Sequence, residues 1–151
     1  MKLRGLSFVK YAEYAPEFPA QFRTAAQRAG LRYEASVVKR LKSLYKDVRA
    51  GPWIVYRAVN KSGVCQPDVL VWLGSKLLLV VEIKLSHQRN ARDKLMNFYG
   101  PLVQRLHPGA ELAYLQVFKN IKKGAHKKLV PFYSIDDHIK PGKYRECQIL
   151  L

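Results

Sequence analysis

The sequence predicts an α/β protein with a central mixed sheet of four to five strands flanked by helices. Residues 66–84 hold two apolar, β-branched runs on either side of Gly74-Ser75, a pattern typical of a β-hairpin. A strand pattern at 112–118 follows a helical pattern at 88–106. A strand–helix–strand unit of this length favours a right-handed crossover between parallel strands. Together, the antiparallel hairpin and this parallel pair predict a mixed sheet.

The chain before the hairpin predicts an irregular arm, two helices and a strand. Residues 1–19 show no clear period and are expected to lie on the domain as an arm. A short helix is expected at 20–29, ended by Gly30, because glycine is a frequent helix terminator. A second helix is expected at 33–48, where the buried stripe at helical spacing is Val37, Leu41, Leu44, Tyr45 and Val48.

Gly51-Pro52 separates that helix from a first core strand at 53–59, and Asn60 to Gly63 reads as a turn. In the helix expected at 88–106, Gly100-Pro101 predicts a kink or a split, because an interior proline removes a backbone hydrogen bond.

The C-terminal part predicts further strands around a basic segment. A strand is expected at 130–135, and residues 144–151 are expected to end the chain as a strand or an apolar tail. We expect 1–151 to form a single domain, with a basic loop and C-terminal strands over 119–151.

Charge points to a polyanionic partner. The 151 residues include 27 Lys and Arg against 11 Asp and Glu, a net charge of +16. Such an excess repels itself in a compact chain and is typical of proteins that bind nucleic acid. We therefore expect DNA as the partner, with RNA not excluded. The basic residues expected to contact phosphates are Lys39, Arg40, Lys119, Lys122, Lys123, Lys127 and Lys128.

A membrane partner is not expected, because the sequence has no run of 18 or more apolar residues. Residues 1–5 lack the apolar core of a secretion signal. The two cysteines, Cys65 and Cys147, suffice for neither a disulfide framework nor a zinc site. These features predict a cytoplasmic location.

Few polar residues interrupt the predicted hairpin. Asp68 opens its first strand, and Glu82 and Lys84 share a face near the end of its second. A carboxylate within a run of Leu and Val is costly unless it is paired or binds a metal. Both carboxylates can share a metal only if they project from the same face. That condition requires a three-residue loop such as Gly74 to Lys76, or a bulge, because a two-residue Gly74-Ser75 turn would place Asp68 opposite Val81.

Pro67-Asp68 followed by Glu82-Ile83-Lys84 resembles the motif of the PD-(D/E)XK nuclease superfamily. The resemblance implies a restriction-endonuclease-like core and Mg²⁺-dependent hydrolysis of phosphodiester bonds, with Mn²⁺ as a substitute. It implies Asp68 and Glu82 as metal ligands and Lys84 as the catalytic lysine. The small size favours an endonuclease or a Holliday-junction-resolvase-like enzyme, and a homodimer is compatible with it.

Several alternatives stay open from the sequence. Glu34 matches a third acidic ligand that many members carry on the preceding helix, or it is an acidic residue favouring the helix dipole in a first turn. Tyr99 either belongs to the site or is a core residue, and Lys94 stands where a glutamine would be expected. Gln66 either contacts the site or is a polar strand entrance. The alternative to an enzyme is a catalytically silent nucleic-acid-binding module on the same fold.

Overall fold

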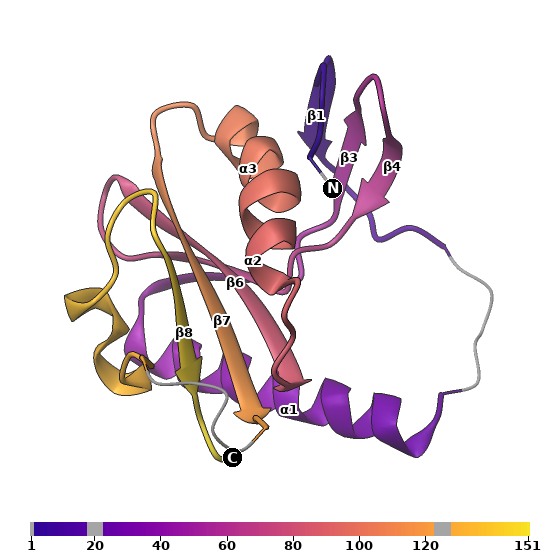
Figure 1. Ribbon diagram of the computed structural model, residues 1–151. Helices are drawn as coiled ribbons and strands as arrows, with labels where there is room; N and C mark the ends of the chain where they lie inside the picture. The colour runs from indigo at the N-terminus through magenta and orange to yellow at the C-terminus, as the bar shows by residue number, and fades with distance from the viewer. Residues whose placement is uncertain (1, 18–22, 123–127) are drawn as a thin grey trace.

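The computed structural model describes residues 2–17, 23–122 and 128–151 (Figure 1). Its strands are β1 (Phe8–Tyr11), β2 (Asp47–Ala50), β3 (Ile54–Arg57), β4 (Ser62–Cys65), β5 (Val69–Trp72), β6 (Leu77–Ser86), β7 (Glu111–Asn120) and β8 (Tyr144–Gln148). Its helices are α1 (Ala25–Leu44), α2 (Ala91–Asp93), the π-helix η1 (Lys94–Tyr99), α3 (Gly100–Leu106) and the 3₁₀ helix η2 (Phe132–Asp137). No helix among the described residues is both long and apolar enough to cross a bilayer.

A mixed five-stranded sheet forms the centre of the fold, in the order β2-β5-β6-β7-β8. The β2–β5 and β5–β6 pairs are antiparallel, whereas β6–β7 and β7–β8 are parallel. The expected α/β class, the hairpin and the parallel crossover are therefore confirmed.

The two faces of this sheet are buried by different elements. Helix α1 covers one face, where Val37 and Leu41 pack against alternate residues of β5 and β6 such as Val69 and Val81. The segment α2–η1–α3 covers the other face, where Leu95 and Leu102 meet side chains that include Leu70, Leu78 and Val80. Figure 1 shows α1 running across the end of the sheet toward which β6 and β7 point. The α1 helix is thus close to the ends of these parallel strands.

The expected pair of N-terminal helices is wrong, because α1 is one continuous helix that passes through Gly30. It begins with a capping box in which the Thr24 hydroxyl accepts from the Gln27 amide and the Gln27 side chain accepts from the Thr24 amide. An interior glycine costs a helix only about 1 kcal/mol. Burial of Tyr33 and of the residues one and two turns further along outweighs that cost.

The expected end of the second helix at Val48 is also wrong. Helix α1 ends at Leu44, and Asp47–Ala50 instead form β2, which pairs with β5 at the edge of the sheet. Val48 is half-buried there and packs against the core on the α1 side, so its apolar side chain is used by a strand and not by a helix.

The arm expected over residues 1–19 contains a strand. Strand β1 pairs with β3, and β3 pairs with β4, in a separate antiparallel sheet of three strands. The expected strand at 53–59 is present as β3. The expected turn at 60–63 is shorter than predicted, because Ser62 and Gly63 already belong to β4.

The helix expected at 88–106 is present as α2, η1 and α3. In the π segment the Gly100 amide donates to the Leu95 carbonyl, five residues back. Pro101 then lies in the first turn of α3, where its missing N–H is tolerated. The widened turn is how the chain accommodates Gly100-Pro101.

The expected strand at 130–135 is wrong, because this region forms η2. Phe132 and Ile135 are both buried, and the backbone between them is kinked at Ser134, whose φ and ψ are not helical. Strand β8 is present but ends at Gln148, and the apolar residue Ile149 continues into the core.

Candidate functional site

The β5–β6 register satisfies the condition for a shared carboxylate site. Trp72 pairs with Leu78 and Val69 with Val81, and the Leu73 amide donates to the Leu77 carbonyl at 2.9 Å. The connection is therefore the three-residue loop Gly74 to Lys76. One position beyond this pairing, Asp68 lies opposite Glu82, and residues directly opposite on antiparallel strands share a face.

Asp68 is anchored at the start of β5 by the backbone of β6. Its Oδ2 atom accepts a hydrogen bond from the Ile83 amide at 2.6 Å. Burial, followed by the charges of Glu82 and Glu34, raises the pKa of the Asp68 carboxyl to about 8, although the Ile83 amide and Lys84 act in the opposite direction. The carboxyl is therefore held in a place where its negative charge is disfavoured.

Glu82 projects from the middle of the sheet and is 2% exposed. Its Oε1 atom lies 3.3 Å from Lys84 Nζ and 3.6 Å from Lys94 Nζ. Its Oε2 atom is buried and has no hydrogen-bond partner among the described residues. Leaving a buried carboxylate oxygen unsatisfied is unfavourable, so this oxygen indicates a missing partner.

Glu34 lies close to both hairpin carboxylates. Burial and the charge of Glu82 raise the pKa of Glu34, whereas Lys84 and a hydrogen bond with Asp68 lower it. The alternative that Glu34 favours a first-turn dipole is wrong, because α1 begins at Ala25 and has no acidic residue in its first turn. The fold thus brings together all four residues expected at the site: Glu34, Asp68, Glu82 and Lys84.

These residues fit a divalent cation by their chemistry. Carboxylate oxygens are the ligands that Mg²⁺ prefers, and Mg²⁺ usually takes only one or two of them, with waters and substrate phosphates completing its shell. The unsatisfied Glu82 oxygen and the raised pKa of Asp68 are both relieved by a positive ion. Among the described residues no group of three or more His, Cys, Asp or Glu side chains is placed to hold a metal ion by itself.

Tyr99 and Lys94 come from η1 and border Glu82. Tyr99 is buried, and its hydroxyl donates to the Gln66 carbonyl at 3.3 Å. Burial and the charge of Glu82 raise the pKa of Tyr99. Tyr99 is thus a core residue that also lies beside the carboxylates of the site. Gln66 donates from its side chain to the Gly51 carbonyl at 2.9 Å, which makes it a structural strand entrance.

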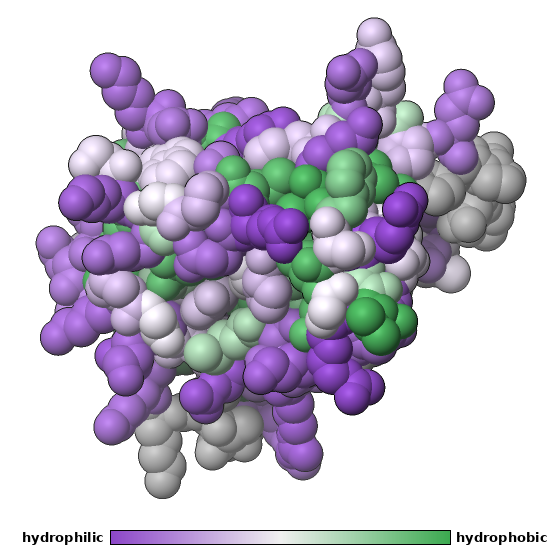
Figure 2. All heavy atoms as spheres, turned by 90° about the horizontal axis from the view of Figure 1, so that it is seen from above, coloured by the Kyte–Doolittle hydropathy of each residue, from purple (hydrophilic) through white to green (hydrophobic). Residues whose placement is uncertain are grey.

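The basic residues expected to bind phosphates lie in separate places. Lys39 and Arg40 are exposed on α1, and Arg40 donates to the Tyr133 hydroxyl at 2.6 Å. Lys119 is the second-last residue of β7 and lies at the same end of the sheet as Lys84, since Lys84 pairs with Phe118. Exposed Lys122 follows shortly after. Lys128 is exposed as well, whereas Lys123 and Lys127 lie outside the described residues. In Figure 2 hydrophilic side chains project over most of the face that is seen, around a smaller apolar area.

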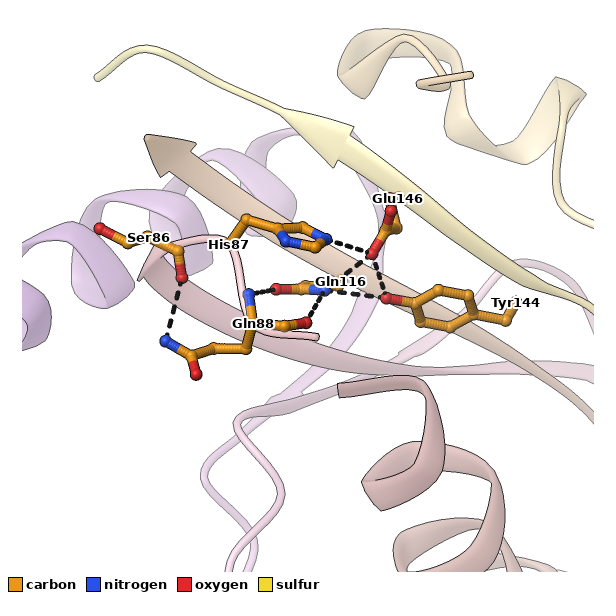
Figure 3. Close-up of polar contacts among 6 residues, drawn as sticks. All are labelled: Ser86, His87, Gln88, Gln116, Tyr144 and Glu146. Atoms are coloured by element: carbon orange, nitrogen blue, oxygen red, sulfur yellow. Dashed lines mark hydrogen bonds and ion pairs between the residues drawn. The ribbon is translucent and has the colours of Figure 1, made fainter. Parts of the chain in front are cut away.

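A second polar cluster, which sequence reasoning missed, continues the row of Glu82 across the sheet. Glu82 pairs with Gln116 on β7, and Gln116 pairs with Glu146 on β8. The buried Glu146 Oε2 atom accepts from Gln116 Nε2 at 2.9 Å and from the Tyr144 hydroxyl at 2.5 Å, and it lies 2.7 Å from His87 Nε2 (Figure 3). This carboxylate, unlike Glu82, is well supplied with donors.

The same cluster fixes the loop that follows β6. The Gln116 side chain accepts from the Gln88 amide at 2.8 Å and donates to the Gln88 carbonyl at 3.1 Å. The His87 amide donates to the Asn120 carbonyl at 2.8 Å. Gln116 and Glu146 lie within expected apolar strands, so the signal that identified Asp68 and Glu82 could have found them too. The cluster holds the chain rigidly only a few residues after Lys84.

Comparison with known proteins gave no matching family model, no matching curated protein and no matching solved structure.

Proposed function

We propose that this chain is a Mg²⁺-dependent nuclease with a restriction-endonuclease-like core that hydrolyses phosphodiester bonds in DNA, as an endonuclease or a junction-resolvase-like enzyme. The observation that carries the proposal is the buried Glu82 Oε2 atom, which has no partner among the described residues, on the strand opposite Asp68 and close enough to Glu34 for their charges to interact. Repulsion among the carboxylates of Glu34, Asp68 and Glu82 destabilises the fold, and a bound cation would offset it.

Asp68, Glu82 and Glu34 would hold the metal ion. Mg²⁺ bound there would neutralise charge on the phosphoryl oxygens and would make a water a better nucleophile. The Ile83 amide keeps Asp68 in one orientation by its 2.6 Å hydrogen bond. The burial of Glu82 excludes bulk water from one side of the site, which strengthens the electrostatic interactions there.

Lys84 has an electrostatic role in this proposal. Its ammonium group contacts Glu82 and is 39% exposed, so it can reach a phosphate that approaches from solvent. An ammonium group at this place suits the stabilisation of the phosphoryl charge or the orientation of the attacking water. Lys94, whose Nζ atom lies 3.6 Å from Glu82 Oε1, adds a second positive charge.

The test combines cleavage with binding. Asp68→Asn and Glu82→Gln should each abolish Mg²⁺-dependent cleavage of linear, nicked, flapped and four-way DNA. Binding in Ca²⁺, measured by fluorescence anisotropy, should stay equal or become tighter because a negative charge beside a phosphate is removed. Asp47→Asn is the matched control, since it removes an exposed carboxylate from β2. Wild-type protein that binds DNA but cuts no DNA or RNA in Mg²⁺ or Mn²⁺ would contradict the enzyme and leave the silent binding module.

The salt dependence of binding tests the basic surface separately. Each phosphate contact contributes about −0.9 to the slope of log K against log salt for duplex DNA. Replacing Lys119 and Lys122 by Ala should flatten the slope if the end of the sheet beside Lys84 holds the DNA. A flattened slope for Lys39→Ala with Arg40→Ala instead would place the contact on α1.

A further inference from the structure

Gly30 has no role that folding explains. It lies in the interior of α1 with ordinary helical geometry, because the described glycines with positive φ are other ones. A Cβ atom added to it would meet no heavy atom within 4 Å. Glycine in a helix interior is less stable than alanine. The absence of a side chain here therefore keeps a space open at a cost to stability.

That space is a pocket beside the carboxylates. A pocket of about 330 Å³ lies between the first turns of α1 and the end of β6. Residues 27, 30, 31 and 34 share one helical face, so Gly30 stands one turn before Glu34. The lining is Arg23, Gln27, Gly30, Leu31, Glu34, Ile83, Lys84 and Leu85. Two proposed catalytic residues thus line it, Glu34 from α1 and Lys84 from β6.

The lining suits a nucleoside attached to a phosphate. Leu31, which is 44% exposed, offers apolar contact together with Leu85. Arg23 and Lys84 supply positive charge at the rim. The volume lies at the small end of the range for ligand pockets, about 300–1,000 Å³. A DNA duplex is too wide for such a space, whereas one nucleotide turned out of its stack is the size of a small ligand.

We propose that this pocket, the Gly30 pocket, receives one unpaired nucleotide next to the scissile phosphate, so that the preferred substrate is DNA with an unpaired base at the cut. This inference rests on the proposed nuclease function. Extracting a paired base from a duplex requires unstacking energy that an already unpaired base does not. A bulged or single-stranded site should therefore be cut at least about tenfold faster than the same sequence in a perfect duplex.

The variants that test the pocket are Gly30→Leu and Ala35→Leu. A Cβ atom at position 30 enters open space, so a leucine there should extend into the pocket, and helix stability should not fall because leucine is a better helix former than glycine. Ala35 is an exposed residue of the same helix that does not line the pocket. Thermal unfolding confirms that both variants fold. We expect Gly30→Leu to lower kcat/KM on bulged DNA about tenfold or more and Ala35→Leu to leave it unchanged.

A binding measurement separates this proposal from the enzyme. The probe is a DNA duplex with one bulged 2-aminopurine, titrated in EDTA so that no cleavage occurs. Its emission should change with wild-type protein and with Ala35→Leu but not with Gly30→Leu. If Gly30→Leu gave the same emission change as the wild type, or cut bulged DNA at the same rate, the role of the pocket would be refuted. The proposed nuclease function would be unaffected. A Gly30-dependent response from a protein that cuts no DNA would overturn the nuclease and keep the pocket as a nucleotide site.

Discussion

Asp68→Asn should make the metal-free protein more stable at alkaline pH. The folded carboxyl has a pKa of about 8, above its ordinary value of 3.8, because burial and neighbouring carboxylates disfavour its charge. A group of this kind contributes stability at low pH that is lost as the pH rises through the folded pKa. The loss should therefore extend from about pH 4 to about pH 8. Asparagine carries no charge at any of these values.

The size of the effect follows from the same carboxyl. A change of one pKa unit corresponds to about 1.4 kcal/mol, so the interval from 3.8 to about 8 sets an upper limit near 6 kcal/mol. Relaxation of Glu34 and screening by salt reduce this, and we expect a gain of roughly 2 kcal/mol in the free energy of unfolding at alkaline pH. Asparagine can still accept from the Ile83 amide through its carbonyl oxygen, so the anchor of the strand is kept.

Urea unfolding in EDTA at several pH values measures this directly. Wild-type stability should fall between about pH 4 and about pH 8, whereas Asp68→Asn should show a flatter profile. Asp47→Asn removes the same charge from an exposed position and should follow the wild type. If Asp68→Asn were less stable than the wild type at alkaline pH, the carboxylate cluster would be a stabilising network, and the argument for an ion site would fail.

Four further outcomes test the site and its surroundings. Mg²⁺ at a hundredfold excess over its dissociation constant should raise the free energy of unfolding by about 2.7 kcal/mol, and a thermal unfolding curve that EDTA leaves unchanged would contradict this. Glu34→Gln should slow Mg²⁺-dependent cleavage about 10–100-fold in single-turnover assays, whereas a wild-type rate would remove Glu34 from the ligand set. Gln116→Leu deprives buried Glu146 of a donor and should cost about 1–3 kcal/mol in urea unfolding. Gly30→Ala should instead add about 0.5–1 kcal/mol, because its Cβ atom enters open space.

The elements predicted correctly are those with strong patterns. The hairpin has long apolar runs around a turn, and the helical segment between its second strand and β7 favours the parallel pairing of these two strands. The position of Asp68 beside Glu82 was predictable only conditionally, because it depends on a loop of three residues. That loop length is a property of the backbone that side-chain periodicity does not reveal.

The incorrect elements share a physical cause. Gly30 favours a helix end locally, but Tyr33 and Leu41 are buried against the sheet and hold the helix through it. Val48 continues a helical period and yet lies in an edge strand. In both places tertiary burial outweighs local preference, and burial is known only once the sheet order is known.

Glu82 and Glu146 lie in one row of paired residues across the sheet, with Gln116 between them. The two carboxylates differ in their hydrogen-bond donors. Glu146 Oε2 accepts from two side-chain donors and lies 2.7 Å from His87 Nε2, so its burial is balanced within the protein. Glu82 Oε2 lacks any such donor among the described residues, although two lysines contact the other oxygen. Glu146 therefore has hydrogen-bond donors that Glu82 Oε2 lacks among the described residues, although both side chains project from the same sheet. We propose that this buried oxygen, close to two further carboxylates, belongs to a cation-binding site.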